Sequence, residues 1–173
     1  MAETAIILPV PDAEPIVGDL RRRYDPGASR GVPPHITLLY PFAPPSTVAM
    51  HLDSLRQFFV GAPAFDFVLD SIGRFPANAH LSPNPAAPFI SLTESIASRW
   101  PQFPPYGGQF STIVPHLTVA DGVGIAAFEE VERTLRDRLP IACRARVAWL
   151  LQSDHEGQWR RTNEFVLAVR PEA

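Results

Sequence analysis

The sequence contains no lysine, only one cysteine and no long apolar run, and each absence excludes a class of protein. With Cys143 as its single cysteine, the chain can form neither an internal disulfide nor a cysteine-based zinc site. Its apolar stretches fall well short of the roughly 18 residues that a membrane-spanning helix needs, so we expect no membrane association. The first residues lack a basic stretch ahead of an apolar one, and we therefore expect a cytoplasmic protein without a signal peptide.

The charge balance excludes a second class, proteins that coat long nucleic acids. The net charge is −3 and the sequence pI is about 5.9, whereas binding along RNA or DNA needs a basic face. A small anionic ligand or one nucleic-acid end needs only a few local cations. All 15 basic residues are arginines, which together with 20 prolines is typical of a GC-rich genome and receives no functional weight here.

The length of 173 residues and the 46% hydrophobic content suit one domain, residues 1–173, built as two small lobes on a shared core. Apolar spacing and turn residues predict strands and helices along the chain. The predicted strands are 5–10, 35–40, 65–75, 79–82, 89–92, 116–120, 141–153 and 159–170. The predicted helices are 13–24, 47–60, 93–100 and 125–139.

The order of these elements repeats. A proline, a His-x-Thr strand, a helix, a strand, a hairpin and another strand occur twice, starting at residues 35–37 and again at 116–118. This order predicts an internal duplication and an α+β fold. We expect two pseudo-symmetric antiparallel sheets with flanking helices and a central cleft between the two lobes.

The two His-x-Thr motifs place chemistry on one face of each strand. Side chains alternate along a strand, so His35 and Thr37 point one way, as do His116 and Thr118, while the intervening residues enter a core. Two imidazoles can divide the work at a phosphodiester, one taking a proton and the other giving one. Threonine hydroxyls can donate to the non-bridging oxygens. One such triplet is usually structural, but two at matching places in a repeat are far more specific.

The segments Pro34–Phe42 and Val114–Ala120 resemble the paired signatures of the two-histidine (2H) phosphoesterase superfamily. Within it, they are similar to the bacterial 2′-5′ RNA ligase-like branch, as are Phe103–Gly108 and Gly73–Pro76. The resemblance extends over about residues 5–170. It implies a bilobal fold with the active cleft between the lobes.

The resemblance also implies an activity. Such enzymes open 2′,3′-cyclic phosphates, or related cyclic or 2′-5′ phosphodiesters, of nucleotides or RNA ends without a metal or cofactor, and some join RNA through a 2′-5′ bond. The resemblance implies that His35 and His116 are the acid–base pair, without showing which one is the base. It also implies that Thr37 and Thr118 donate hydrogen bonds to the phosphate oxygens. Some ligase-like members have an arginine after the second motif, where this chain has Asp121, which counts against ligation.

Two further residues are candidates for substrate binding. Tyr106 lies in a glycine-rich loop and could stack on a base, unless the loop only packs on its own aromatics. Arg74 could contact phosphate, unless it is a solvated strand residue. His51, His80 and His155 have no evident partner in the sequence and are left outside the site.

We therefore expect a monomeric enzyme acting on a small nucleotide or an RNA terminus. Two alternatives remain open. A non-catalytic nucleotide or RNA-end binder would use the same cleft. A metalloenzyme using both histidines is a poorer fit, because the sequence offers no Asp or Glu at ligand spacing.

Overall fold

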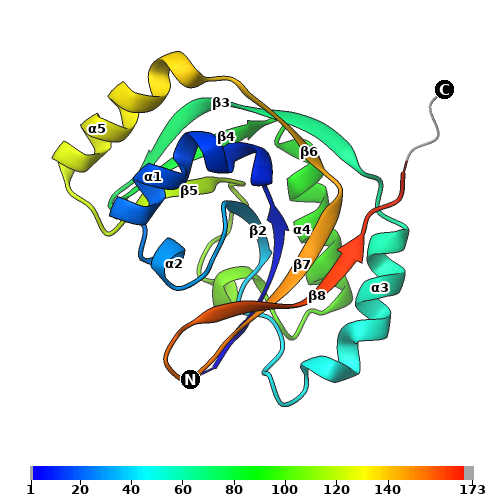
Figure 1. Ribbon diagram of the computed structural model, residues 1–173. Coiled ribbons are helices and arrows are strands. Elements are labelled where there is room, and N and C mark those ends of the chain that lie inside the picture. The colour runs from blue at the N-terminus through cyan, green and yellow to red at the C-terminus, as the bar shows by residue number, and fades with distance from the viewer. Residues whose placement is uncertain (1, 170–173) are drawn as a thin grey trace.

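A computed structural model describes residues 2–169, which form two four-stranded antiparallel sheets with flanking helices (Figure 1). The first sheet has the order β2 (His35–Leu39), β1 (Thr4–Pro9), β7 (Val147–Ser153) and β8 (Trp159–Val166). The second has the order β5 (Leu117–Asp121), β4 (Asn78–Asn84), β3 (Phe65–Phe75) and β6 (Ile141–Ala145). The predicted α+β class with two antiparallel sheets is confirmed.

The helices flank the two sheets. They are α1 (Glu14–Tyr24), α2 (Pro26–Ser29), α3 (Leu52–Val60), α4 (Ala87–Arg99) and α5 (Ile125–Leu135). Helix α1 connects β1 to β2 of the first sheet yet packs against β5 of the second, whereas α4 connects β4 to β5 yet packs against β2. Each sheet is therefore buttressed by a helix that belongs to the other.

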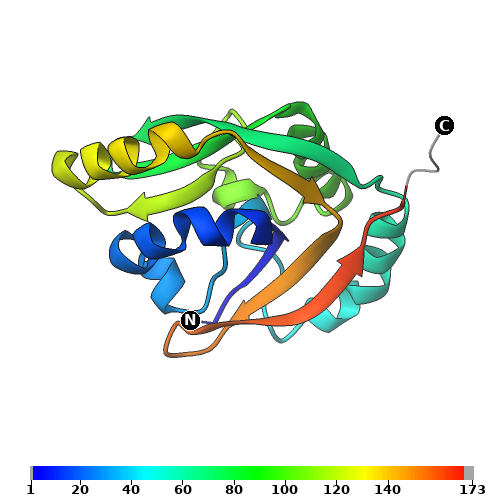
Figure 2. The same cartoon turned by 45° about the horizontal axis from the view of Figure 1, so that its top comes forward.

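The two lobes are not the two consecutive halves of the chain. Figure 2 shows the strands from both ends of the chain, in blue and in orange to red, in one layer. The two motif strands, β2 and β5, are edge strands of their sheets, and these edges contact each other. The fold thus brings the two motifs together from distant parts of the chain, while the duplication itself stays a prediction.

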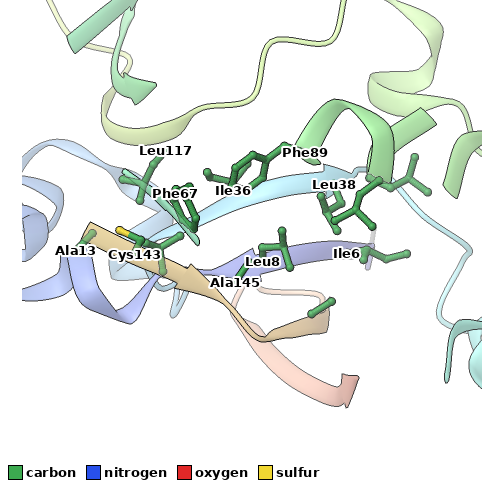
Figure 3. Packing of buried hydrophobic residues seen from close by; sticks show 14 of the residues in the cluster. Ile6, Leu8, Ala13, Ile36, Leu38, Phe67, Phe89, Leu117, Cys143 and Ala145 are labelled. Carbon is green, nitrogen blue, oxygen red and sulfur yellow. The ribbon is translucent and has the colours of Figure 1, made fainter. Parts of the chain in front are cut away.

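One hydrophobic core holds this arrangement. Ile36 and Leu38 of β2 and Leu117 of β5 are fully buried and belong to a single cluster with residues of both sheets and of α4 (Figure 3). Burial of each such side chain stabilises the fold by about 1.5–3 kcal/mol. Because the motif strands share this core, their other faces are fixed relative to one another.

The predicted strand at residues 89–92 is wrong, because these residues belong to α4. Phe89, Leu92, Thr93 and Ile96 are buried, which is the three- and four-residue spacing of one helix face. Pro88 lies in the first turn, where its missing N–H costs no hydrogen bond. A short apolar run is compatible with a strand or a helix, and here the three- and four-residue spacing of the buried side chains, which continues to Ile96, indicates the helix.

The predicted strand 141–153 is two strands that belong to different sheets. The chain leaves the second sheet after Ala145 and enters the first at Val147. The last strand ends at Val166, earlier than predicted, and its predicted end at residue 170 lies outside the described residues. Between residues 2 and 169, no helix is both long and apolar enough to cross a membrane.

Candidate active site

His35 and Thr37 lie on the open face of β2, and Thr118 lies on that of β5, with His116 directly before the first residue of β5. His35 and Thr37 are half-buried, as are His116 and Thr118, while the residues between and beyond them are buried in the core. This is the alternation that the sequence predicts for a strand with one face in a core. The two His-Thr pairs therefore occupy the faces of two edge strands that meet.

Both histidines are anchored in the same way. The Nδ1 atom of His35 lies 2.8 Å from the carbonyl oxygen of Pro33, and that of His116 lies 2.7 Å from the carbonyl oxygen of Val114. A carbonyl can only accept, so Nδ1 donates in each ring. The Nε2 atom of each histidine is then the one that can exchange a proton with a ligand.

His35 is a neutral imidazole at neutral pH. Its pKa falls from 6.5 to about 4, chiefly because burial disfavours the charged ring; the hydrogen bond to Pro33 and the negative charge of Asp25 oppose this shift, and the positive charges of Arg21 and His116 add to it. The influence of His116 means that the two imidazoles sense each other's charge. The hydroxyl oxygen of Thr37 lies 3.2 Å from His35 Nε2 and donates to it in this tautomer.

A buried ion pair holds the segment ahead of the first motif. Arg21 is only 2% exposed and binds Asp25 at 2.7 Å, and it also donates to the carbonyl of Val32 at 3.1 Å. The same carboxylate accepts from the backbone N–H of Gly27. The loop that supplies the anchor of His35 is thereby fixed to α1.

His116 lies against two rings that the sequence did not assign to the site. The centroids of Phe75 and His80 are 5.1 and 5.2 Å from that of His116. Burial lowers the pKa of His116, and it lowers the pKa of His80 from 6.5 to about 4 with a smaller contribution from the charge of His116. The amide of Asn78 also reaches Thr118, at 3.3 Å. The pairing of β4 with both β3 and β5 brings these residues here, and no local sequence pattern encodes it.

Tyr106 lies beside Thr37 of the first motif, while its predicted role in substrate binding stays a prediction. Its phenol is near the Thr37 hydroxyl, which lowers its pKa, but burial has the larger effect and raises the pKa overall. Its backbone is left-handed, with φ of 51°, and its N–H donates to the carbonyl of Tyr40 at 2.6 Å. Such a backbone is uncommon for a residue other than glycine and is enriched at functional sites.

A cavity of about 540 Å³ adjoins Thr37 and Tyr106. Its walls come from the loop at residues 104–115 and from one side of α4, where Glu94 and Ser98 supply polar groups. A larger hollow of about 890 Å³ lies where β6 meets β7, but none of the four motif residues lines it. In the described part of the chain, no three His, Cys, Asp or Glu side chains are grouped closely enough to hold a metal ion.

Arg74 does not join the motif residues, contrary to expectation. Its guanidinium lies over the ring of Phe128 in α5, 4.8 Å from the ring centre. Its neighbours Gly73 and Phe75 face His80, so strand alternation directs Arg74 to the opposite face of the sheet. The segment Gly73–Pro76 resembles the family, but the Arg74 side chain packs against α5.

The family model described as the 2′-5′ RNA ligase superfamily matches residues 8–157, a span that includes both motifs. The chain belongs to this superfamily. Among proteins of curated function, none matches it. Membership fixes the broad class of the site as a phosphoesterase or ligase type and leaves the particular reaction open.

Solved structures share the fold of this superfamily member over nearly its full length. E. coli LigT complexed with NADP+ is 18% identical, with a TM-score of 0.61 and coverage of 96% of this chain and 97% of that one. A Thermus thermophilus protein is 14% identical with a TM-score of 0.65, covering 98% and 100%. A structure described as a phosphoesterase is 17% identical with a TM-score of 0.62, covering 97% and 99%. At these identities the likeness establishes the LigT-like fold.

The low pKa values of His35 and His80 predict how stability depends on pH. Both are about 4 in the folded protein against 6.5 ordinarily, so between these values the unfolded chain binds more protons. Stability should therefore rise with pH from about 4 to 6.5 and be lost as pH falls through this window, with about two protons taken up by these two rings on unfolding. Urea unfolding at a series of pH values measures this number.

The variant His80→Asn should reduce the proton uptake by about one. His155→Asn, in an exposed turn, is the matched control for removing a histidine. A free energy of unfolding that is flat across this window would contradict the assigned burial of both rings.

Proposed function

We propose that this protein is a metal-independent phosphodiesterase that opens 2′,3′-cyclic phosphates, or related cyclic or 2′-5′ phosphodiesters, at nucleotides or RNA ends. The observation that supports this most is the matched anchoring of His35 and His116 through Nδ1. It leaves the Nε2 atom of each ring free for a ligand, with the Thr37 hydroxyl beside that of His35, at two strand edges that meet. Two such groups on either side of one phosphorus are what an in-line displacement requires.

In the proposed reaction, His35 is the base and His116 the acid. Neutral His35 accepts a proton from a water molecule as its oxygen bonds to phosphorus, and the protonated form of His116 gives its proton to the leaving ribose oxygen as the old P–O bond breaks. A phosphomonoester and a free hydroxyl result. Burial lowers the pKa of His35 to about 4 and keeps this ring unprotonated, which suits the base, whereas the pKa of His116 is lowered by burial but raised by the Val114 carbonyl and by the charge of Asp121. In the reverse reaction, the two roles exchange.

The threonines and the cavity complete the proposal. Thr37 and Thr118 donate to the non-bridging phosphate oxygens, where charge accumulates. The nucleoside lies in the cavity beside Tyr106. The volume of this cavity, about 540 Å³, is in the range of small-molecule sites. E. coli LigT has been crystallised with NADP+, ATP and 3′-AMP, which supports a nucleotide as the ligand class.

Hydrolysis is proposed over ligation because of the charge at the end of β5. Asp121 is exposed there and lies near the Asn78 amide that reaches Thr118. A carboxylate at this place repels a second phosphate-bearing strand, although it leaves a single small substrate able to enter.

The test is turnover of the pure protein in EDTA. We expect 2′,3′-cyclic nucleotides and RNA oligonucleotides ending in a cyclic phosphate to be converted to phosphomonoesters, followed by chromatography or ³¹P NMR. Turnover that EDTA abolishes and a metal restores would contradict the metal-independent mechanism. Tight nucleotide binding without any turnover would instead make the protein a binder.

A further inference from the structure

Two side chains of the neighbouring strand β4, Asn78 and His80, lie beside Thr118 of the second motif. On β4, His80 is paired with Thr118 and Asn78 with Asp121, and the register shifts between Ala79 and His80, so that β5 has one extra residue there. Such bulges occur often beside active sites, where they redirect a side chain. Here the bulge sets Asn78 and His80 alongside Thr118.

The hydrogen bonds among these residues have one consistent direction. The Nδ2 atom of Asn78 lies 3.3 Å from Thr118 Oγ1 and 3.5 Å from Asp121 Oδ1. A carboxylate only accepts, so this atom is the amide nitrogen and the carbonyl oxygen of Asn78 faces His80 Nδ1 at 3.3 Å. His80 therefore donates to Asn78, and Asn78 donates to Thr118.

We infer that Asn78, held by His80, is a positioning residue that reserves the Thr118 hydroxyl proton for the substrate phosphate. An N–H donated into one lone pair of the Thr118 oxygen cannot receive that oxygen's own proton. The proton is then free to point into the site. This inference rests on the proposed function and names a residue that acts through Thr118.

The first motif is arranged differently, which makes the role of Asn78 specific. The Thr37 hydroxyl lies 3.2 Å from His35 Nε2 and donates to it while no ligand is bound. The Thr118 oxygen instead accepts from an amide. The two His-x-Thr motifs thus differ in the hydrogen bonds of their threonines, and in the second one the hydroxyl proton is free to bind an anion.

Packing keeps His80 where the chain of hydrogen bonds needs it. The ring is 4% exposed and packs against Phe75, at 4.4 Å between centroids, and against His116, at 5.2 Å. On its edge, a Cβ at Gly73 would lie 2.2 Å from His80 Nε2, so the absence of a side chain there makes room for the ring. Packed against Phe75, His116 and Gly73, the His80 ring is held with its Nδ1 atom facing Asn78.

The decisive variant is Asn78→Asp, which keeps the shape but cannot donate. Its carboxylate would draw the Thr118 proton away from the substrate, so we expect kcat to fall by about 10²-fold with little change in KM. Asn84→Asp is the control for adding a carboxylate at the exposed end of the same strand; it also removes a hydrogen bond to Asp70, so its stability is measured alongside its rate. Asn78→Ala removes the donor without adding charge and should cost less than Asn78→Asp.

A double-mutant cycle separates positioning from simple charge repulsion. With Thr118→Val already in place, Asn78→Asp should lower kcat no further, because the hydroxyl it acts on is gone. A further loss in that background, or full activity of Asn78→Asp alone, would overturn the inference while leaving the proposed function intact.

A second readout does not depend on activity. The ¹⁵N NMR signals of the His80 ring should show its proton on Nδ1 in the wild type and a shift of the tautomer toward Nε2 in Asn78→Ala. A wild-type proton on Nε2 would overturn the hydrogen-bond chain. If the wild type turns over no cyclic phosphate, the proposed function fails and the role of Asn78 falls with it, while the tautomer still reports whether the chain exists.

Discussion

Replacing either His35 or His116 by alanine is expected to lower turnover of a 2′,3′-cyclic nucleotide by about 10²–10⁴-fold. Each change removes one of the two Nε2 atoms that the backbone carbonyls of Pro33 and Val114 direct to the site. Both rings are half-buried at the site and their loss opens little of the core, so the fold should persist. Steady-state rates of the purified variants, with circular dichroism to check folding, measure the effect.

The two histidines should also be strongly non-additive. If they act on one phosphorus, the double variant should lose little more than the worse single one, because either absence already breaks the acid–base pair. His155→Ala is the control, since its side chain lies in an exposed turn away from both motifs. A His35→Ala or His116→Ala variant that retains the wild-type rate would exclude a mechanism shared between the lobes.

The second large effect is expected from Gly73→Ala, a change of one methyl group. The new Cβ would lie 2.2 Å from Nε2 and 2.9 Å from two carbons of the His80 ring, which Phe75 holds from the other side. The ring must move, and overpacking of this kind costs about 1–3 kcal/mol of stability. His116 lies against the same ring, so we expect turnover to fall as well.

Urea unfolding and steady-state rates of Gly73→Ala test this packing. Gly124→Ala is the matched control, because no atom lies within 4 Å of a Cβ there and the backbone is extended. In a Gly73→Ala/His80→Ala double variant the clash disappears, so its loss of stability should be smaller than the sum of the two single losses. Unchanged stability and rate in Gly73→Ala would mean that the His80 ring does not occupy this place.

The parts of the site that could be predicted are those with a local cause. Alternation along a strand places His35 with Thr37 and His116 with Thr118, and the prolines and apolar neighbours mark where each strand lies. These are properties of a few consecutive residues. The repeated order of strands and helices likewise predicts two antiparallel sheets, because each repeat contains strands with one apolar face to bury.

The errors and omissions arise where distant segments decide the outcome. Residues 89–92 are helical because their apolar face has to cover β2, and Arg74 points away from the site because its strand neighbours face His80. His80 itself has no local signal, since its role depends on the register of β4 against β5. Register is set by long-range pairing and core packing, which a short sequence window does not contain.

The sequence alone therefore predicted that the histidine and threonine of each motif share a strand face, and it predicted the class of fold, because period-two alternation is a local property. Only the tertiary structure decided that the sheets take strands from both ends of the chain and that their motif edges meet. It also decided that Asn78 and His80, not Arg74, accompany the second motif. The physical reason is that one shared core, with its helices exchanged between the lobes, sets the position of every edge strand at once.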